Sequence, residues 1–354
     1  MRDVAVVGFA QTPQVRRHDG TTNGVEMLIP IFAEVLGGLG LTKADIDFWC
    51  SGSSDYLAGR AFSFISAIDA IGPVPPINES HVEADAAWAL YEAWCKLQTG
   101  EVDTALIYGF GKSSAGDVRR AMALQLDPYT VSPLWPDTLA VAGLQARMGL
   151  DAGLWSERDM ADVAVRSRRD AQANPNAQLS GSKDADELLA QPYLAEPLRQ
   201  HDCAPITDGA SVIVLAAQGR ARELVERPAW ITGIAHCIDS ANLGARDLTV
   251  SASTTAAASG AATAASGGIE VAELQSPFTH QELILRRALD LSDSVRITPS
   301  GGALAGNPMF AAGLVRIGEA AKQIFTASAG KVLAHATSGP ALQHNLVCVM
   351  EGRA

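Results

Sequence analysis

The chain of 354 residues lacks the features that mark several large classes of protein. Its five cysteines are scattered and form no Cys-x-x-Cys pair, which argues against a structural zinc site and for reduced thiols. No stretch of about 18 residues is continuously bulky and apolar, and the N-terminus starts directly with a strand pattern, so we expect neither a membrane span nor a signal peptide. With a net charge of −12 and no long Lys/Arg run, nucleic-acid binding is not expected. These absences favour a cytoplasmic protein without a bound metal.

Short apolar runs alternate with helical patterns along most of the chain. Val4–Phe9 and "DTALIYGFG" (Asp103–Gly111) are typical of strands, whereas Gly24–Leu39 and Asp85–Leu97 carry apolar residues at helical spacing. Hydrophobic residues make up 47% of the chain and charged ones 19%, which is a globular balance. The alternation predicts an α/β protein with a mostly parallel, buried sheet that is covered by helices.

The pattern also predicts how the chain is divided. From about residue 114 to residue 200 it becomes mainly helical, with polar and Pro/Asn-rich turns, which indicates an insertion. A second α/β half with a similar rhythm begins near Pro228, and this suggests a duplicated architecture. We therefore expect an N-terminal half over residues 1–224, with the insertion inside it, and a C-terminal half over residues 225–354.

Several segments, in order along the chain, resemble the thiolase superfamily. They include "VEADAAWALYEAWCKLQTGEVDTALIYGFGKSS", "DCAPITDGASVIVLAA", "VAELQSPFTHQELI" and "TPSGGALAGNPMFAAG". The likeness is strongest to the sterol-carrier-type thiolases, also called lipid-transfer proteins. It implies a thiolase fold of two duplicated βαβαβαββ halves in five layers with an inserted helical loop domain. It also implies tight dimers and an active site at the N-termini of two buried central helices.

The positions that carry the chemistry in that family hold other residues here. Matching "VEADAAWA" to the family's Cys-Ala-Ser-Gly places Ala86 at the nucleophilic cysteine, and losing a nucleophile costs up to about a million-fold in rate. Gln275 replaces one family histidine, and Asn307 replaces the histidine of Gly-His-Pro. Thr337 and Ser338 stand near the expected second thiol. We therefore predict that the chain does not cleave ketothioesters through an acylated intermediate.

Four residues remain candidates for a modified site, each with a simpler alternative. Asp85 precedes the first buried helix, where it is a possible base but more often an N-cap. His81 lies at the end of the preceding strand, and it either reaches the pocket or is a structural histidine. Gln275 and Asn307 could form an oxyanion hole, because side-chain amides donate well to developing charge, or they could be vestigial.

The resemblance also suggests where a CoA thioester would bind as substrate or ligand. The family's loop domain receives CoA, so Arg166, Arg168 and Arg169 are candidates for its phosphates, although such a cluster is more often a solvated helix face. Ser300 and Gly301 could bring the backbone close to a thioester, or they could form a tight turn before a helix. In "TDGA" we expect the Asp208 side chain to bond locally within a turn.

Three functions follow as hypotheses. The first is a catalytically degenerate subunit of a complex that performs retro-aldol cleavage of steroid or lipid acyl-CoA side chains, a reaction known from one cysteine-free branch of the family. That branch implies partners: a homologous thiolase-fold subunit in a homo- or heterodimer, and a zinc-ribbon/OB-like acyl-CoA-binding protein. The second is a stand-alone retro-aldolase, although this chain lacks the tyrosines of that branch near Gln275 and Met309. The third is a non-catalytic acyl-CoA or sterol binder.

Overall fold

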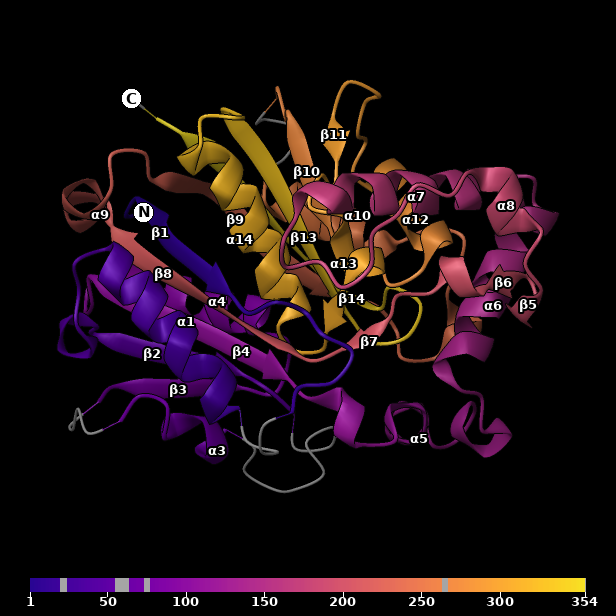
Figure 1. Ribbon diagram of the computed structural model, residues 1–354, viewed down its shortest axis with the longest axis horizontal. Helices are drawn as coiled ribbons and strands as arrows, with labels where there is room; N and C mark the ends of the chain where they lie inside the picture. Colours follow the sequence, from indigo (N-terminus) through magenta and orange to yellow (C-terminus); the bar gives the residue numbers. More distant parts are fainter. Residues whose placement is uncertain (20–23, 55–63, 73–76, 263–266, 354) are drawn as a thin grey trace.

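The structure is a computed structural model that describes residues 1–19, 24–54, 64–72, 77–262 and 267–353. These residues are built around one ten-stranded sheet in the order β11-β10-β13-β14-β9-β1-β8-β4-β2-β3 (Figure 1). The first half of the chain supplies the five strands at one end of the sheet: β1 (Val4–Gln11), β2 (Phe48–Gly52), β3 (Glu79–Val82), β4 (Thr104–Gly111) and β8 (Gly209–Ala217). The second half supplies the other five: β9 (Ala229–Ile238), β10 (Val271–Leu274), β11 (Arg296–Ile297), β13 (Lys331–Ser338) and β14 (His344–Gly352).

The two halves repeat the same order of elements. In the first half, the helices between the strands are α1 (Val25–Gly38), α3 (Ile65–Ile68) and α4 (Ala86–Thr99). In the second half, the corresponding helices are α10 (Ala252–Gly260), α12 (Thr279–Ala288) and α14 (Ala312–Phe325). Apart from short extra pieces, each half therefore reads βαβαβαββ, which confirms the predicted duplication.

Side-chain alternation along the strands separates the core into three parts and makes five layers. In β1, Val4 and Val6 point to one face of the sheet and pack with α4 and α14, whereas Ala5 and Val7 point to the other face and pack with α1. The second half repeats this arrangement, with α10 and α12 on its outer face. The helices α4 and α14 thus lie in the centre, between the two halves of the sheet (Figure 1). The predicted five layers are confirmed.

The sheet is mixed, so the prediction of a mostly parallel sheet was wrong. The pairs β2–β3, β2–β4, β10–β11 and β10–β13 are parallel. The five pairs through the middle, which involve β1, β8, β9 and β14, are antiparallel. A strand buried on both faces is a continuous apolar run in either orientation, so composition alone does not separate the two arrangements.

A long segment between β4 and β8 is mainly helical, as predicted. It contains α5 (Val118–Leu124), α6 (Thr138–Asp151), α7 (Glu157–Asp170), α8 (Ala185–Leu189), and the short strands β5 (Tyr193–Ala195), β6 (Leu198–Arg199) and β7 (Ile206–Thr207). Most of it lies beside the second half of the sheet (Figure 1). The exact domain limits stay a prediction. None of the described helices is both long and apolar enough to span a membrane.

Two fully buried histidines make the fold sensitive to acid. His280 Nε2 lies 3.1 Å from Gln145 Oε1, and His335 Nε2 lies 3.0 Å from Asn345 Oδ1. Burial lowers the pKa of His280 to about 3 and that of His335 to about 4. Between these values and the unfolded pKa of about 6.5, only the unfolded chain binds the proton, so stability is lost as the pH falls through this window.

We therefore expect His335 alone to reduce the free energy of unfolding by about 2 kcal/mol between pH 7.5 and pH 5. Buried carboxyl groups with a raised pKa, such as Asp85 and Glu273, favour the folded state as the pH falls. The effect of His335 is therefore measured as a difference between the parent chain and a variant that lacks this histidine. Urea unfolding of the parent chain and of His335→Gln at both pH values should show the smaller acid-induced loss in the variant. Equal losses in the two proteins would contradict this assignment.

Candidate functional site at the central helix termini

The N-termini of α4 and α14 meet between the two halves of the sheet. The Ala86 N–H at the start of α4 donates to the carbonyl oxygen of Phe310, just before α14, at 2.9 Å. This approach requires glycine on the neighbouring strand, because a Cβ at Gly109 would lie 2.3 Å from that same carbonyl oxygen. Two positive helix ends therefore share one small, buried volume.

Asp85 caps both helices at once. Its Oδ1 accepts from the N–H groups of Ala87 and Leu314 at 2.9 and 3.2 Å, and its Oδ2 accepts from the Gly313 N–H at 3.0 Å. The side chain is only 4% exposed. Burial raises the pKa of this carboxyl, while the three N–H donors favour its charged form. The predicted N-cap is thus present, and it serves a second helix that the sequence did not reveal.

Ala86 presents a methyl group at the place implied for the nucleophile. It is fully buried, and its Cβ would be 2.7 Å from a Cβ at Gly109. On the other side, a Cβ at Gly313 would lie 2.5 Å from Asp85 Oδ1. Small residues thus let the helices and strands close around the Asp85 carboxylate.

Gln275 lies beside the same region and holds the end of β13. Its Oε1 accepts from the Thr337 N–H at 2.9 Å, and Thr337 Oγ1 donates to the His344 carbonyl oxygen at 3.3 Å. Trp88, one turn into α4, is 5% exposed and donates from Nε1 to His344 Nε2 at 2.9 Å. His344 must therefore accept at Nε2, which makes it a neutral ring, and burial with nearby His236 lowers its pKa to about 4.

Asn307 stands on β12 (Asn307–Pro308), which pairs with β7. Its backbone N–H donates to Thr207 Oγ1 at 2.9 Å. Its Oδ1 atom is buried and has no hydrogen-bond partner among the described residues. A buried amide oxygen of this kind costs free energy unless a ligand or water donates to it. Asn307 therefore offers a buried acceptor atom that no described residue uses.

His81 does not join Asp85. It is paired in register with Ser51 on β2, and His81 Nδ1 lies 3.0 Å from Ser51 Oγ. Its ring also stacks on Phe64 with centroids 4.8 Å apart. Alternation places Ser51 and His81 on the outer face of the sheet, whereas α4 packs on the inner face. The two side chains are thus on opposite faces.

The arginines of α7 differ in what they contact. The Arg166 guanidinium donates to the Ile297 carbonyl oxygen and pairs with the buried Glu282 carboxylate, so it joins α7 to the C-terminal half. Arg168 is partly buried, and desolvation lowers its pKa. Arg169 is exposed and lies 3.0 Å from Asp170. Arg166 is therefore committed to internal contacts, and Arg169 is the exposed member of the three.

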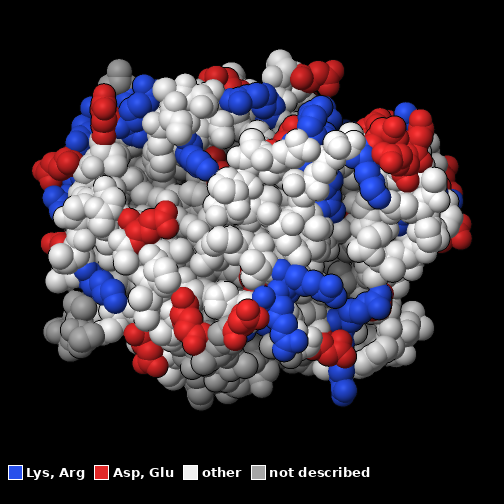
Figure 2. Space-filling view, in the orientation of Figure 1, with Lys and Arg blue, Asp and Glu red and all other residues white. Residues whose placement is uncertain are grey.

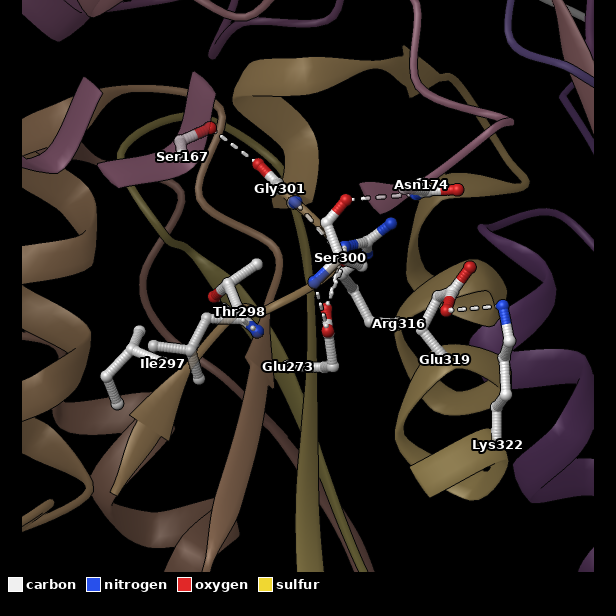
Figure 3. A network of polar contacts seen from close by, with 12 residues as sticks. Ser167, Asn174, Glu273, Ile297, Thr298, Ser300, Gly301, Arg316, Glu319 and Lys322 are labelled. Carbon is white, nitrogen blue, oxygen red and sulfur yellow. Dashed lines mark hydrogen bonds and ion pairs between the residues drawn. The ribbon is translucent and has the colours of Figure 1, made fainter. Parts of the chain in front are cut away.

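Ser300 and Gly301 form a tight turn inside a buried polar network (Figure 3). Ser300 donates from N and Oγ to the Glu273 carboxylate at 3.0 and 2.7 Å, and Arg316 Nη1 donates to the same carboxylate at 2.8 Å. Glu273 is 0% and Arg316 2% exposed. Burial raises the pKa of Glu273, and Arg316 opposes this shift. Gly301 has a φ of +89°, which glycine adopts without strain.

The same turn fastens the inserted segment to the core. Ser167 Oγ of α7 donates to the Gly301 carbonyl oxygen at 2.6 Å, and Asn174 Nδ2 donates to the Ser300 carbonyl oxygen at 2.9 Å. Figure 3 shows both contacts on the side of the turn opposite Glu273. The Glu273–Arg316 pair was not predicted from the sequence, although two charged residues in apolar runs are a signal for a buried pair.

Asp208 bonds over long range, so the prediction of a local turn was wrong. Its fully buried carboxylate accepts from the His18 N–H at 2.9 Å and from the Ser114 N–H and Oγ at 3.1 and 2.5 Å. It therefore joins the loop after β1 to the loop after β4. The role is structural, but its partners lie 190 and 94 positions away.

The arrangement at the helix termini offers hydrogen bonding rather than nucleophilic chemistry. Its carboxylate is held by three backbone donors, its nucleophile position is a methyl group, and its neighbouring groups are neutral amides and a hydroxyl. Among the described residues of this site, Asn307 could accept a hydrogen bond from a polar ligand group, whereas Ala86, Gln275 and Thr337 offer no thiol or imidazole.

Comparison with known proteins points to one superfamily. No protein-family model matches the chain. An acetyl-CoA acetyltransferase of Methanothermobacter thermautotrophicus is 25% identical in an alignment of 351 positions that covers 92% of this chain and 91% of the relative. A 17-hydroxy-3-oxo-4-pregnene-20-carboxyl-CoA lyase of Mycobacterium tuberculosis is 27% identical in an alignment of 247 positions that covers 65% of this chain and 62% of the relative.

Solved structures agree over the full length. An Ltp2-ChsH2(DUF35) aldolase chain matches with a TM-score of 0.83 at 18% identity, covering 99% of this chain and 98% of that one. Human mitochondrial 3-ketoacyl-CoA thiolase matches with a TM-score of 0.76 at 15% identity and 99% coverage of both. The chain is therefore similar to thiolase-superfamily proteins in sequence over nearly its whole length and in its fold. Its fold is the predicted thiolase fold.

Proposed function

We propose that this thiolase-fold protein is a catalytically degenerate subunit of a complex that cleaves steroid or lipid side chains from acyl-CoA thioesters by retro-aldol chemistry. One observation carries the proposal: at the meeting point of α4 and α14, the Ala86 methyl group cannot act as a nucleophile, and the buried Asp85 carboxylate is engaged as a cap of both helices. The relatives named as a lyase and an aldolase support the reaction class.

The partner follows from the same reasoning. A retro-aldol cleavage needs a base for the β-hydroxyl group and a donor for the enolate oxygen. Here the side-chain amides of Asn307 and Gln275 are possible donors, whereas the Asp85 carboxylate already accepts three backbone N–H groups as a helix cap. The missing base would come from a homologous thiolase-fold subunit in a dimer. A zinc-ribbon/OB-like protein that delivers the acyl-CoA is the second expected partner.

The experiment compares the chain alone with the chain in its complex. Purified chain, incubated with a β-hydroxyacyl-CoA steroid thioester, should release no product and carry no acyl adduct by intact-mass spectrometry. The complex co-purified from the native source should cleave the same thioester at least a hundred-fold faster, about 3 kcal/mol of transition-state stabilisation.

The alternatives have distinct outcomes. Turnover by the isolated chain that Asn307→Ala removes would replace the proposal with a stand-alone retro-aldolase. Saturable binding of the thioester without turnover, alone or with any partner, would instead indicate a non-catalytic acyl-CoA or sterol binder. A covalent acyl adduct would overturn all three.

A further inference from the structure

A basic hollow of about 430 Å³ opens on the surface beside the strand that pairs with β12. Arg16 and Arg17, from the loop after β1, line it together with Arg119 of α5 and Ile206 of β7. We call it the arginine hollow. Figure 2 shows Lys and Arg side chains gathered where Figure 1 places β7 and the beginning of α5. On a chain with a net charge of −12, such a concentration attracts anions locally.

The walls of the arginine hollow are held in place by Asp208. The backbones of Val15 and Asp208 exchange two hydrogen bonds of 3.0 and 2.7 Å. The Asp208 carboxylate adds the bonds to His18 and Ser114 described above. The loops that carry Arg16 and Arg17 on one side and α5 on the other are therefore fixed to each other, so a ligand would meet a preorganised wall.

Two of the three guanidinium groups have no counter-charge among the residues that the structure describes. Arg16 and Arg17 are exposed, and neither forms an ion pair within the described part of the chain. Arg119 lies 2.8 Å from Asp137, and Asp117, which also lines the hollow, accepts the Arg120 N–H at 3.1 Å. The arginine hollow therefore presents a net positive charge to a ligand. A planar guanidinium donates two parallel hydrogen bonds to a phosphate, so phosphate chemistry fits best.

The arginine hollow is connected to the candidate site by a short pair of strands. Ile206 on its wall is the register partner of Asn307, whose buried Oδ1 has no described partner. Three residues further along the chain, Phe310 accepts the N–H of Ala86. A ligand with phosphates at one end and a hydrogen-bond donor at the other, such as the hydroxyl of a β-hydroxyacyl group, could therefore extend from the hollow along β7 and β12 to the Asn307 Oδ1 atom.

We propose that the arginine hollow binds the diphosphate of a CoA thioester and directs the thioester toward Asn307. The identity of the ligand rests on the proposed function; the phosphate chemistry rests on the hollow itself. This assignment moves the phosphate contacts from the arginines of α7, where Arg166 is committed to Glu282 and Ile297, to the loop after β1 and the beginning of α5.

The test is calorimetric titration of the full chain with CoA and, separately, with inorganic pyrophosphate. The Arg16→Gln/Arg17→Gln double variant should raise the Kd for both probes by about tenfold or more, since charged hydrogen bonds are lost. Arg169→Gln tests the alternative site on α7, and Arg158→Gln, which removes another exposed arginine of α7, serves as the matched control with no expected change in Kd. Added NaCl should weaken binding to the parent chain more than to the double variant.

Each outcome decides the assignment. Parent-like binding by the double variant, weakening by Arg169→Gln of the same size, or no binding of either probe to the parent chain would overturn it. Binding of pyrophosphate without binding of CoA would also overturn it. If the double variant loses both probes while no complex ever cleaves a thioester, the hollow stands and the proposed function fails. If CoA binds independently of Arg16 and Arg17 while the complex cleaves the thioester, the proposed function stands and the assignment of the arginine hollow fails.

Discussion

Arg316→Met is expected to lower the free energy of unfolding by about 3–5 kcal/mol, because it leaves an uncompensated charge in the core. The guanidinium lies 2.8 Å from the fully buried Glu273 carboxylate, and Glu319 on the same helix is also buried. Without Arg316, Glu273 must either remain charged without a partner or take up a proton. Urea unfolding at neutral pH measures the loss.

Two comparisons make this result specific. Arg158→Met breaks an exposed pair with Asp186 and should change stability by less than about 1 kcal/mol. The double variant Arg316→Met/Glu273→Leu removes both charges and should recover much of the lost stability. Replacing a whole buried ion pair with apolar residues is often close to neutral, because no charge is left unpaired. A single variant as stable as the parent chain would contradict the buried network.

Asp85→Ala should have an effect of similar size, about 3–5 kcal/mol, because it leaves three buried N–H groups without an acceptor. Two of these donors belong to α14 and one to α4. Asp85→Asn keeps one acceptor oxygen, so its free energy of unfolding should fall clearly less than that of Asp85→Ala. Both variants are measured by thermal and urea unfolding, and the retro-aldol activity of the complex is assayed with each. Together these measurements distinguish a helix-capping role of Asp85 from a role as catalytic base.

A cap and a base differ in which readout changes. If Asp85 is a cap, stability follows the number of acceptor oxygens, and the folded complex with Asp85→Asn keeps its activity. If Asp85 is a base, Asp85→Asn abolishes turnover while the unfolding free energy changes little. Asp137→Asn, at the exposed N-cap of α6, is the matched control and should cost no more than about 1 kcal/mol.

The sequence predicts the individual elements well where local chemistry decides. The helical spacing over Asp85–Leu97 gives α4 (Ala86–Thr99) with Asp85 as its cap, because the apolar stripe and the capping residue are both local signals. The Ser300–Gly301 turn is likewise visible from its glycines. His81 could have been assigned to the outer face, since apolar Val82 beside it must face the core.

The contacts that assemble the site are not local, and for that reason the sequence does not reveal them. Asp85 reaches Gly313 and Leu314 across 228 and 229 positions, and nothing near any of the three residues indicates the others. Asp208 was assigned a local bond because its turn composition favours one, but tertiary packing supplies better donors. The arginine pair after β1 was visible, whereas the hollow beside it depends on three separate loops.

The seam between the two halves of the sheet is very short. Only Ala5 with Trp230 and Val6 with Ala229 are paired between β1 and β9. Two fragments made by cutting the chain after α9 (Gln218–Leu224) would therefore lose few β-sheet hydrogen bonds on separating. Each separated fragment would nevertheless expose an unpaired strand edge, at β1 or at β9. Bared edges recruit strands from other molecules, so separately expressed fragments should aggregate, whereas co-expressed fragments should shield one another and remain dispersed.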